Sequence, residues 1–554
     1  MSTTATPKGA AGLRAHDPKH EASKAGPMSK VGGLAGWLDD RTGTARPVDY
    51  LLKKVFPDHW SFMLGEIALY CFTILVLTGT YLTFFFEAST RDVVYHGRYL
   101  PLNGAHVSAA YASVVRISFD VRAGMVMRQM HHWAALVFIA AIVVHLCRIF
   151  FTGAFRRPRE INWIIGVTLL LLAIFNGFSG YSLPDDLLSG VGLRIAYSVA
   201  QSVPFIGTWL AFLLFGGEFP SGQIISRLFV IHVMIIPGLL VGLIGAHLAI
   251  LWHQKHTQFP GRGRTETNVL GSRLYPTYAL RSVGLFFGIA AVLGAMAGLV
   301  QINPVWLYGP FTPAAVSSPA QPDWFMGWLE GALRLFPAFE IRAFHHSIPN
   351  PFFPTVLLPG ITFGALFLWP FIENRFTHES DRAHHLLDRP RDKPARTAFG
   401  AGVLTFYTVL FFAGSNDVIA KTFSWSVAAV TLTMRVLVVV LPFVVAWGTF
   451  AVMRGLRDSE AEGLLELPLG DVVPWVHPPS NGHPPGGGEA RALSLGDLVA
   501  TDEPFVASPV LPEANPDSPA AKETVEPKEP AAAEIAWESL GLAPPETREP
   551  SGGE

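Results

Sequence analysis

The stretch MRQMHHWAALVFIAAIVVHLCRIFF, residues 127–151, decides the fold. It is long and apolar enough to cross the ~30 Å hydrocarbon core of a bilayer as one α-helix. It nevertheless contains three histidines, His131, His132 and His145. Polar rings inside a membrane span are costly, and they indicate a functional site unless they merely hydrogen-bond a backbone carbonyl. The stretch therefore predicts a membrane helix that carries ligand-binding side chains.

The whole chain has the composition of a membrane protein. Its 554 residues are 50% hydrophobic and only 15% charged, against roughly 25% charged residues in soluble domains. The net charge of -2 argues against a strongly basic nucleic-acid binder. The two cysteines, Cys71 and Cys147, lie inside apolar runs and form no Cys-x-x-Cys-His motif. This excludes a disulfide framework, covalent c-type haem and a cysteine-bound iron–sulfur cluster, so any redox centre needs other ligands.

Eight apolar runs are long enough to span the bilayer, where backbone polar groups must be satisfied within each helix. The expected fold is an all-α integral membrane protein with eight transmembrane helices. The first four form an N-terminal four-helix bundle, and four C-terminal helices follow. The runs cover residues 61–86, 125–150, 161–181, 223–252, 282–301, 352–372, 398–415 and 430–453.

The composition divides the chain into five segments. We expect a polar N-terminal tail at 1–50, the four-helix bundle at 51–255, a linker at 256–281, the C-terminal helices with a long outer loop at 282–455, and a disordered tail at 456–554. The last segment is rich in Pro, Ala, Glu and Gly, and this composition cannot bury enough apolar surface to fold alone. No cleavable signal peptide is expected, because the polar first segment contains no apolar run.

Lysine and arginine are unevenly distributed between the two sets of connecting loops. The loops at 152–160, 253–281 and 373–397 contain 14 of these residues in 63 positions, whereas the alternating loops contain 8 in 138. Loops rich in positive charge stay in the cytoplasm, so both termini are expected on the cytoplasmic side of the cell membrane. The long outer loops carry Trp, Tyr, Pro and Gly, and we expect them to fold onto the membrane surface as short helices.

Four histidines occur at matching depths of two helices. His131 and His145 are 14 residues apart, and His232 and His247 are 15 apart. At 100° per residue each pair returns to one helix face, on two levels ~21 Å apart. Two such helices side by side would form two sites with two imidazoles each, which suits the axial positions of haem iron. Zinc would need more ligands at each level, and His132, turned about 100° from its neighbour, is expected to be a packing or interfacial residue.

Small and basic residues accompany the four histidines. Glycines recur with the same 14-residue spacing on the first and third helices, where missing side chains leave room for a flat macrocycle. Arginines three residues from two of the histidines suit haem propionates, although an arginine near a span end is also a common interfacial anchor. These candidates are Gly65, Gly79, Gly166, Gly180, Arg128 and Arg148.

Five motifs complete the pattern. They are DVRAGMVMRQMHHW at 120–133, FRRPREINWIIGV at 155–167, GFSGYSLPDD at 177–186, QPDWF at 321–325 and PFIENRF at 370–376. Together with the histidine spacings they resemble cytochrome b, the membrane subunit of quinol:cytochrome c reductase, over about residues 50–455. The eight spans, HHLLDRPRD at 384–392 and the long tail are similar to the actinobacterial menaquinol form.

The resemblance implies two non-covalent b haems with His131, His145, His232 and His247 as axial iron ligands. It also implies a Q-cycle, in which menaquinol is oxidised at the outer face and quinone is reduced at the inner face, coupled to proton translocation. The implied partners are a Rieske iron–sulfur subunit, a cytochrome c subunit, a cytochrome c oxidase in a supercomplex, and a second copy of the chain in a homodimer.

In the family, a Pro-Glu-Trp-Tyr motif in an outer loop lines the quinol oxidation pocket. Here it stands as Pro322, Asp323, Trp324 and Phe325. Asp323, a carboxylate among aromatic residues, is expected to accept a quinol proton, and the alternative is that it caps a surface helix. Glu330, seven residues later, is a second candidate for passing the proton on, or else a solvated loop residue.

Further quinone contacts are also carried over from the resemblance. Tyr181 and Pro184, after the third helix, fit the wall of the oxidation pocket. At the inner face the family has a quinone-contacting histidine about one turn beyond a haem ligand. His253 and His256 follow His247 on this side, and His253 is the candidate we retain.

Two other functions compete with this interpretation. A di-haem b anchor of another quinone-linked dehydrogenase would lack QPDWF and the four C-terminal helices. A proton-coupled transporter would use the intramembrane histidines as a relay and would contain no haem.

Overall fold

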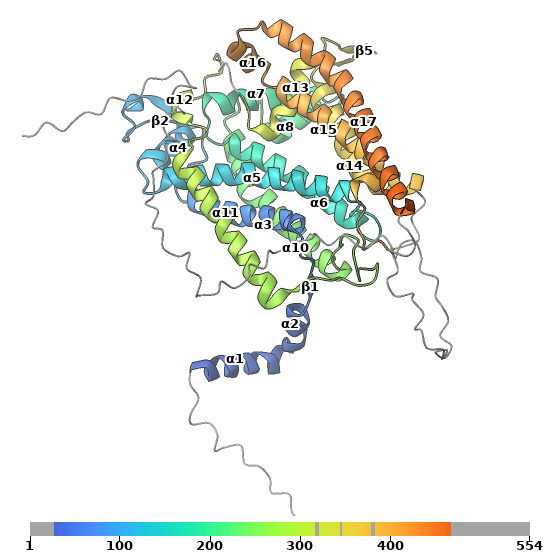
Figure 1. Cartoon of the computed structure of the whole chain (residues 1–554). Coiled ribbons are helices and arrows are strands. Elements are labelled where there is room, and N and C mark those ends of the chain that lie inside the picture. Colours follow the sequence, from blue (N-terminus) through green and yellow to red (C-terminus); the bar gives the residue numbers. More distant parts are fainter. Residues whose placement is uncertain (1–26, 316–320, 344–345, 378–382, 467–554) are drawn as a thin grey trace, which may run out of the picture. The chain divides into compact units, whose positions relative to one another are not determined.

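A computed structural model describes residues 27–315, 321–343, 346–377 and 383–466 of the chain (Figure 1). The predicted tails at 1–50 and 456–554 therefore lie largely outside the described residues. Where the tails are described, they are helical instead of irregular. Helices α1 (Pro27–Thr42) and α2 (Ala45–Leu52) precede the first span, and the last span continues to Glu466.

The prediction of eight spans is confirmed. Within the described residues, eight helices are long and apolar enough to cross a membrane, and each coincides with one of the predicted runs. The spans are α3 (Leu64–Thr83, preceded by η1, Trp60–Met63), α5 (Gly124–Phe151), α6 (Glu160–Tyr181), α9–η3–α10 (Ile224–Val230, Ile231–Ile235, Ile236–Gln254), η4–α11 (Leu274–Tyr278, Ala279–Leu299), η5–α14 (Phe353–Leu357, Leu358–Thr377), α15 (Pro394–Ala413) and α17 (Val427–Glu466).

The first four spans pack together, and the C-terminal spans lie around them (Figure 1). Helix α5 contacts α3 and α6, and α6 contacts α10. Helix α11 lies against α3 and α5, α14 lies against α6, and α15 packs with α17 and α13. Large apolar side chains remain exposed on the outer helices, for example Phe443 and Trp447 on α17. Such a surface is suited to lipid instead of water.

The connections between spans contain most of the remaining structure, as predicted for the long loops. Short helices occur at α4 (Ala109–Phe119), α7 (Leu187–Ser202), α8 (Gly207–Phe215), α12 (Val305–Tyr308), α13 (Trp324–Leu335) and α16 (Asn416–Phe423), with 3-10 turns η2 (Leu100–Leu102) and η6 (Pro390–Asp392). Three short antiparallel strand pairs tie loops together: β1 (Val55–Phe56) with β4 (Ser272–Arg273), β2 (Asp92–Val94) with β3 (His106–Ser108), and β5 (Ile341–Ala343) with β6 (His346–Ile348).

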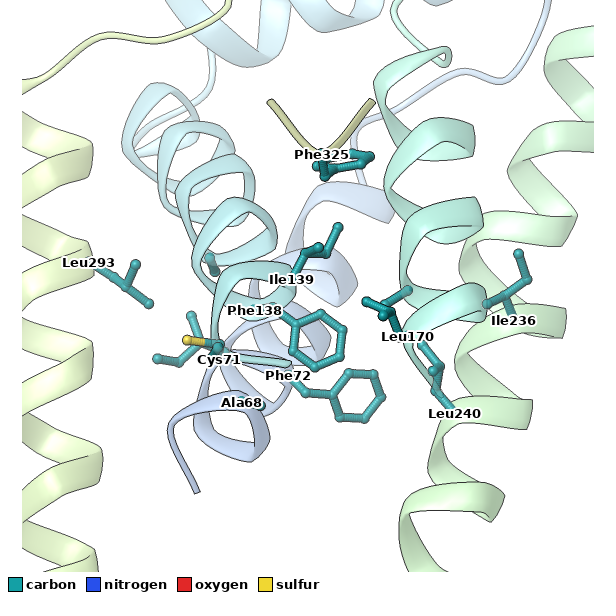
Figure 2. Close-up of a cluster of buried hydrophobic side chains, with 14 residues drawn as sticks. Ala68, Cys71, Phe72, Phe138, Ile139, Leu170, Ile236, Leu240, Leu293 and Phe325 are labelled. Atoms are coloured by element: carbon teal, nitrogen blue, oxygen red, sulfur yellow. The ribbon is translucent and has the colours of Figure 1, made fainter. Parts of the chain in front are cut away.

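The main apolar core lies midway along the bundle (Figure 2). Phe138 of α5 is seven residues from both His131 and His145, and its ring lies 5.7 Å from that of Phe72 on α3. Seven residues of α-helix rise ~10 Å. Leu240 of α10 and Leu170 of α6 complete the cluster from the other side of the bundle. The cluster therefore separates two histidine levels with a closely packed apolar layer.

The fourth span contains a π-helical turn at its first histidine. The turn η3 (Ile231–Ile235) includes His232 and is followed by Pro237 near the start of α10. Proline has no N–H, so the usual helical bond to the carbonyl four residues back, at Val233, cannot form. A π turn holds about one residue more than an α turn. The 15-residue gap between His232 and His247 on this helix therefore matches the 14-residue gap on α5.

Candidate functional site

His131 and His232 face each other across the bundle, and we call this pair the first level. Their ring centroids are 6.2 Å apart, with an interplanar angle of 75°. A bond from an imidazole nitrogen to a metal is about 2 Å long. Two rings bound to opposite sides of one metal ion would therefore place their centroids roughly 6 Å apart. The predicted pairing of α5 with the fourth span is present, at a separation that suits one shared iron.

Hydrogen bonds on the far side of each first-level ring fix its tautomer. Nδ1 of His232 lies 2.9 Å from the carbonyl oxygen of Asn176, which can only accept a hydrogen bond. Nδ1 of His131 lies 2.9 Å from Oγ1 of Thr78, whose own hydroxyl donates to the carbonyl of Ile74 at 2.7 Å. Both Nδ1 atoms therefore donate, and both Nε2 atoms keep the lone pair that a metal requires.

Each predicted glycine lies against one of the four histidine rings. A Cβ added to Gly180 would lie 2.3 Å from Cε1 of His232, and one added to Gly79 would lie 3.0 Å from Cε1 of His131. Position 180 needs glycine, because real Cβ atoms essentially never approach so closely, whereas a Cβ at Gly79 would make a tight contact that requires a small shift of the His131 ring. The glycines therefore let α3 and α6 approach the imidazoles, which is a more specific role than the room for a macrocycle that the spacing predicted.

His145 and His247 form the second level, at the opposite end of the apolar layer. The nearest predicted glycines are Gly65 and Gly166, whose added Cβ atoms would lie 3.4 and 3.6 Å from the respective histidine rings. Nδ1 of each ring is buried and has no hydrogen-bond partner among the described residues. Leaving a buried polar nitrogen unpaired costs about 1–3 kcal/mol, so the protein holds the second-level rings less firmly than the first-level rings.

The two predicted arginines also carry unpaired buried nitrogens. Arg128 donates from both Nη atoms to the carbonyl of Asn303 at 3.1 Å, and its Nε is unpaired among the described residues. Arg148 stacks on Phe62, 4.2 Å from the ring centroid, and its Nε and Nη2 are unpaired within the described chain. A buried guanidinium with free N–H groups favours an anionic partner such as a carboxylate.

A cavity of about 480 Å³ opens at the first level. Both first-level histidines line it, together with Arg128, Tyr181, Pro184 and Asp323. The structure therefore brings two of the four predicted haem ligands and part of the predicted quinol pocket to one continuous space. A volume in this range suits a large organic ligand.

Asp323 does not cap the helix that it precedes. It stands before Trp324 at the start of α13, but its side chain accepts no hydrogen bond from that helix. Oδ1 of Asp323 instead lies 2.8 Å from Nε2 of His132. The expectation that His132 only packs or lies at an interface is therefore corrected, since its 100° turn from His131 aims it at α13. The sequence signal for this contact was the pair of adjacent histidines, because two adjacent rings on a helix point in different directions and contact different neighbours.

The rest of the Pro-Asp-Trp-Phe motif anchors α13 to the bundle. Phe325 is buried against α6, where a Cβ on Gly177 would lie 2.6 Å from its ring. Trp324 packs against the same central core. The two aromatic residues thus fix the position of Asp323 and are absent from the described lining of the cavity.

Glu330 is held in an ion-pair network away from the cavity lining. It pairs with Arg334, one turn later on α13, which also donates to Asp417 at 2.6 Å. Burial raises the pKa of the Glu330 carboxyl, and Arg334 opposes this shift. Glu330 is absent from the described residues that line the cavity. Of the two predicted proton acceptors, Asp323 therefore lines the cavity and Glu330 does not.

On the opposite side of the bundle, the two candidate histidines differ in burial. The side chain of His253 is exposed, whereas His256 is buried, 4.5 Å from the ring of Phe56. Nε2 of His256 has no partner among the described residues. Burial, together with the positive charges of Lys54 and two arginines, lowers the pKa of His256 to about 3. Sequence spacing alone could not show which of the two histidines is buried.

These residues fit haem as the bound group. The two imidazoles of the first level are neutral ligands at the right separation, and the second level presents two buried rings with unpaired nitrogens. The guanidinium groups of Arg128 and Arg148 can each pair with a propionate. A membrane bundle with these sites is characteristic of b-type cytochromes.

Comparison with known proteins agrees with this class. A family described as Cytochrome b(N-terminal)/b6/petB matches residues 136–310. The cytochrome bc1 complex cytochrome b subunit of Mycobacterium leprae is 53% identical over 425 residues, which are 76% of this chain and 77% of that protein. Proteins of the same name from Corynebacterium diphtheriae and Streptomyces coelicolor are 46% and 45% identical, and they match 86% and 84% of this chain and 91% and 86% of their own lengths.

The chain therefore belongs to the cytochrome b subunits of cytochrome bc1 complexes. A solved chain described as Hyperthermophilic respiratory Complex III has the same fold, with a TM-score of 0.56 at 19% identity, over 75% of this chain and all of that one. Membership of the family implies a multi-pass membrane protein that binds haem b and works as one subunit of a respiratory complex.

Proposed function

We propose that the chain is the di-haem membrane subunit of a menaquinol:cytochrome c oxidoreductase and is active only within that complex. In this proposal, quinol is oxidised beside the first level at the outer face, and quinone is reduced beside the second level at the inner face. Protons are released outside and taken up inside. The observation that carries the proposal is the single cavity that joins the first-level histidines to Asp323.

Four histidines and two arginines would hold the haems. His131 with His232, and His145 with His247, would supply the nitrogen ligands, and Arg128 and Arg148 would pair with the propionates. Bound haem would supply one-electron redox chemistry at two depths. The chain itself orients the ligands, and the apolar layer around Phe138 keeps water out of the space between the two levels.

At the quinol side, Asp323 is positioned to accept a proton. His132 holds one carboxylate oxygen at 2.8 Å, which leaves the other free to face a bound quinol. Tyr181 and Pro184 form the wall of the same cavity. Trp324 and Phe325 support this arrangement from α13, and Pro322 lies two residues before that helix. Glu330 would act in a later proton transfer. The reaction at this site thus depends on positioning and proton acceptance.

At the quinone side, the structure favours His256 over His253 for the inner contact. The buried ring of His256 has an unpaired nitrogen that can hydrogen-bond a quinone carbonyl, whereas His253 is exposed. Glu66 lies nearby on α3 and accepts hydrogen bonds from Tyr278 and Ser282 of the η4–α11 span. A carboxylate within a membrane span that is held by hydroxyl groups is suited to proton uptake.

The proposed partners come from the resemblance to the cytochrome b family. A Rieske iron–sulfur subunit and a cytochrome c subunit would accept the electrons, and the two cysteines of this chain cannot hold an iron–sulfur cluster themselves. A cytochrome c oxidase in a supercomplex and a second copy of the chain complete the proposed assembly. The lysine and arginine bias supports placing both termini in the cytoplasm.

The test is the Asp323→Asn variant in the purified complex. Asparagine keeps the shape and an oxygen for His132 but is a far poorer proton acceptor, so quinol oxidation should fall about 100-fold. The reduced spectrum should still show two b haems. The control is Asp92→Asn, which removes the charge from another Asp–His pair, 2.7 Å from His106 on an exposed hairpin. An unchanged rate in Asp323→Asn, or a wild-type complex without b haem, would overturn the proposal.

A further inference from the structure

One buried carboxylate near the cavity has no part in the mechanism so far. Asp186 is 1% exposed and begins α7. Its Oδ2 accepts a hydrogen bond from the backbone N–H of Leu188 at 3.1 Å, and Ser189 completes a capping box. Its Oδ1 is buried and has no hydrogen-bond partner among the described residues. Capping of the helix therefore occupies one carboxylate oxygen of Asp186 and leaves the other without a hydrogen bond among the described residues.

The groups that surround Asp186 come from four separate elements. Tyr111 of α4, Tyr181 at the end of α6, Tyr308 of α12 and Arg128 of α5 all lie within electrostatic range of its carboxylate. The hydroxyl of Tyr111 already donates to the carbonyl of Val305 at 3.3 Å, and none of these groups reaches Oδ1 of Asp186 at hydrogen-bond distance among the described residues.

The backbone fixes this arrangement directly. The N–H of Leu187 donates to the carbonyl of Gly309 at 2.9 Å, and Asp186 forms an isolated antiparallel bridge with Pro310. The end of α12 is thereby held beside the start of α7. Tyr308, the last residue of α12, stays next to Asp186 for this reason.

Two of the tyrosines connect Asp186 with the quinol cavity. Tyr181 lines that cavity and lies within electrostatic range of both Asp186 and Asp323. Tyr308 likewise interacts with both carboxylates. Tyr181 lines the same cavity as Asp323, and the backbone holds Tyr308 beside Asp186, so the two hydroxyls connect the surroundings of the two carboxylates. A hydroxyl that receives one proton and gives up another can relay a proton between them.

We propose that Asp186 is the next proton acceptor after Asp323, reached through the hydroxyls of Tyr181 and Tyr308. This inference rests on the proposed function of the cavity. In the transfer, the O–H bond of protonated Asp323 breaks and its proton passes to the first tyrosine hydroxyl. Each hydroxyl accepts one proton and releases its own to the next group, and an O–H bond forms at Oδ1 of Asp186. No electron moves in this step. It returns Asp323 to its charged form, ready for the next quinol.

The electrostatics of Asp186 suit this role. Burial raises its pKa to about 6, and hydrogen bonds from Ser189 and Leu188 limit the rise. The positive charge of Arg128 and the hydroxyls of Tyr111, Tyr181 and Tyr308 are the groups that face it. Since Asp186 must be deprotonated to accept, the wild-type rate should rise with pH through about 6.

The test is Asp186→Asn in the purified complex, measured as the rate of quinol-driven haem b reduction between pH 5 and pH 8. Asparagine caps helices about as well as aspartate, so α7 should be retained. We expect the rate at pH 7 to fall about tenfold or more and the rise through pH 6 to disappear. A wild-type rate and pH profile in this variant would overturn the inference.

The matched control is the adjacent residue, Asp185→Asn. Burial also raises the pKa of Asp185 to about 6, but it lines a separate cavity of about 200 Å³ with Phe219 and Phe311. Its φ of +54° is one that asparagine tolerates. We expect the wild-type rate and pH profile to be retained. An equal loss in both variants would show a general effect of removing charge from this loop and would overturn the inference.

A second variant keeps the inference testable if the Asp186→Asn complex does not assemble. Tyr308→Phe removes one hydroxyl and keeps the ring, and we expect a rate several-fold below wild type with both haems present. A wild-type rate in Tyr308→Phe, when Asp186→Asn does not assemble, would count against the relay. Failure of the proposed function gives a different result, because Asp323→Asn would then also leave quinol oxidation unchanged.

Discussion

The first and second levels use the same residue types but differ in how firmly the protein holds them. At the first level, both Nδ1 atoms have partners at 2.9 Å, and the glycines leave 2.3 and 3.0 Å for an added Cβ. At the second level, both Nδ1 atoms are unpaired among the described residues, and the corresponding distances are 3.4 and 3.6 Å. The protein therefore holds the first-level rings more firmly than the second-level rings.

The difference agrees with the surroundings of each level. The first level shares its cavity with Asp323. In the proposed function, its rings would have to stay in place while quinol enters and leaves. The second level lies next to basic loops held by ion pairs. Asp388 donates from its backbone to the carbonyl of Thr152, just after α5, and its carboxylate pairs with Arg156 and Arg396. The first level depends on bonds to the ligand rings, and the second depends on the loops beneath it.

The largest effect is expected for Gly180→Ala. The new methyl group would lie 2.3 Å from the His232 ring, which cannot move away without leaving its hydrogen bond to Asn176. We expect loss of the first-level haem, measured as one b haem per chain in the reduced-minus-oxidised spectrum. Gly166→Ala is the matched variant at the second level and should keep both haems, because 3.6 Å is ordinary contact. Equal haem loss in both variants would remove the contrast between the levels.

The next largest effect is expected for Arg396→Met. Arg396 is buried, with only 4% of its side chain exposed, and pairs with Glu373 and Asp388 at 2.6 Å. Removing one partner of a buried ion pair costs about 3–5 kcal/mol, which should lower the Tm of the complex and release the second-level haem first. Arg281→Met breaks an exposed pair with Asp58 and should cost under about 1 kcal/mol. The idea fails if the first-level haem is released first.

A smaller effect is expected for Thr78→Val. This change removes the acceptor of the Nδ1 proton of His131 and keeps the shape of the side chain. Loss of such a supporting hydrogen bond weakens metal binding about 10–100-fold. Titration of haem into the depleted complex should show this loss for the first level only. Thr73→Val, on the exposed side of the same helix, should bind both haems as the wild type does.

The smallest effect is expected for Ser179→Ala. Its hydroxyl lies 3.3 Å from Nδ1 of His232, but the carbonyl of Asn176 accepts the same proton at 2.9 Å. Haem content and midpoint potential should therefore stay close to wild type. A large potential shift would show that the side chain, and not the backbone carbonyl, determines the orientation of the ring.

The sequence predicted the spans and the ligand candidates because both depend on local pattern. Apolar length fixes a membrane helix, and 14-residue spacing places His131 and His145 on one face. The π turn around His232 could be anticipated only in part, since Pro237 removes a hydrogen bond but does not show where the helix widens. The partner of Asp323 could not be found, because His132 lies 191 positions away in sequence.

By itself, the sequence determined the class of protein, the eight spans and the four imidazoles, because lipid imposes length and polarity rules on each segment alone. Only the tertiary structure decided which neighbours those residues have. It aimed His132 at Asp323, buried His256 in preference to His253, and left one oxygen of Asp186 free behind the cavity wall. These pairings depend on how helices far apart in the chain pack, and the sequence of one helix does not determine which residues of another helix it contacts.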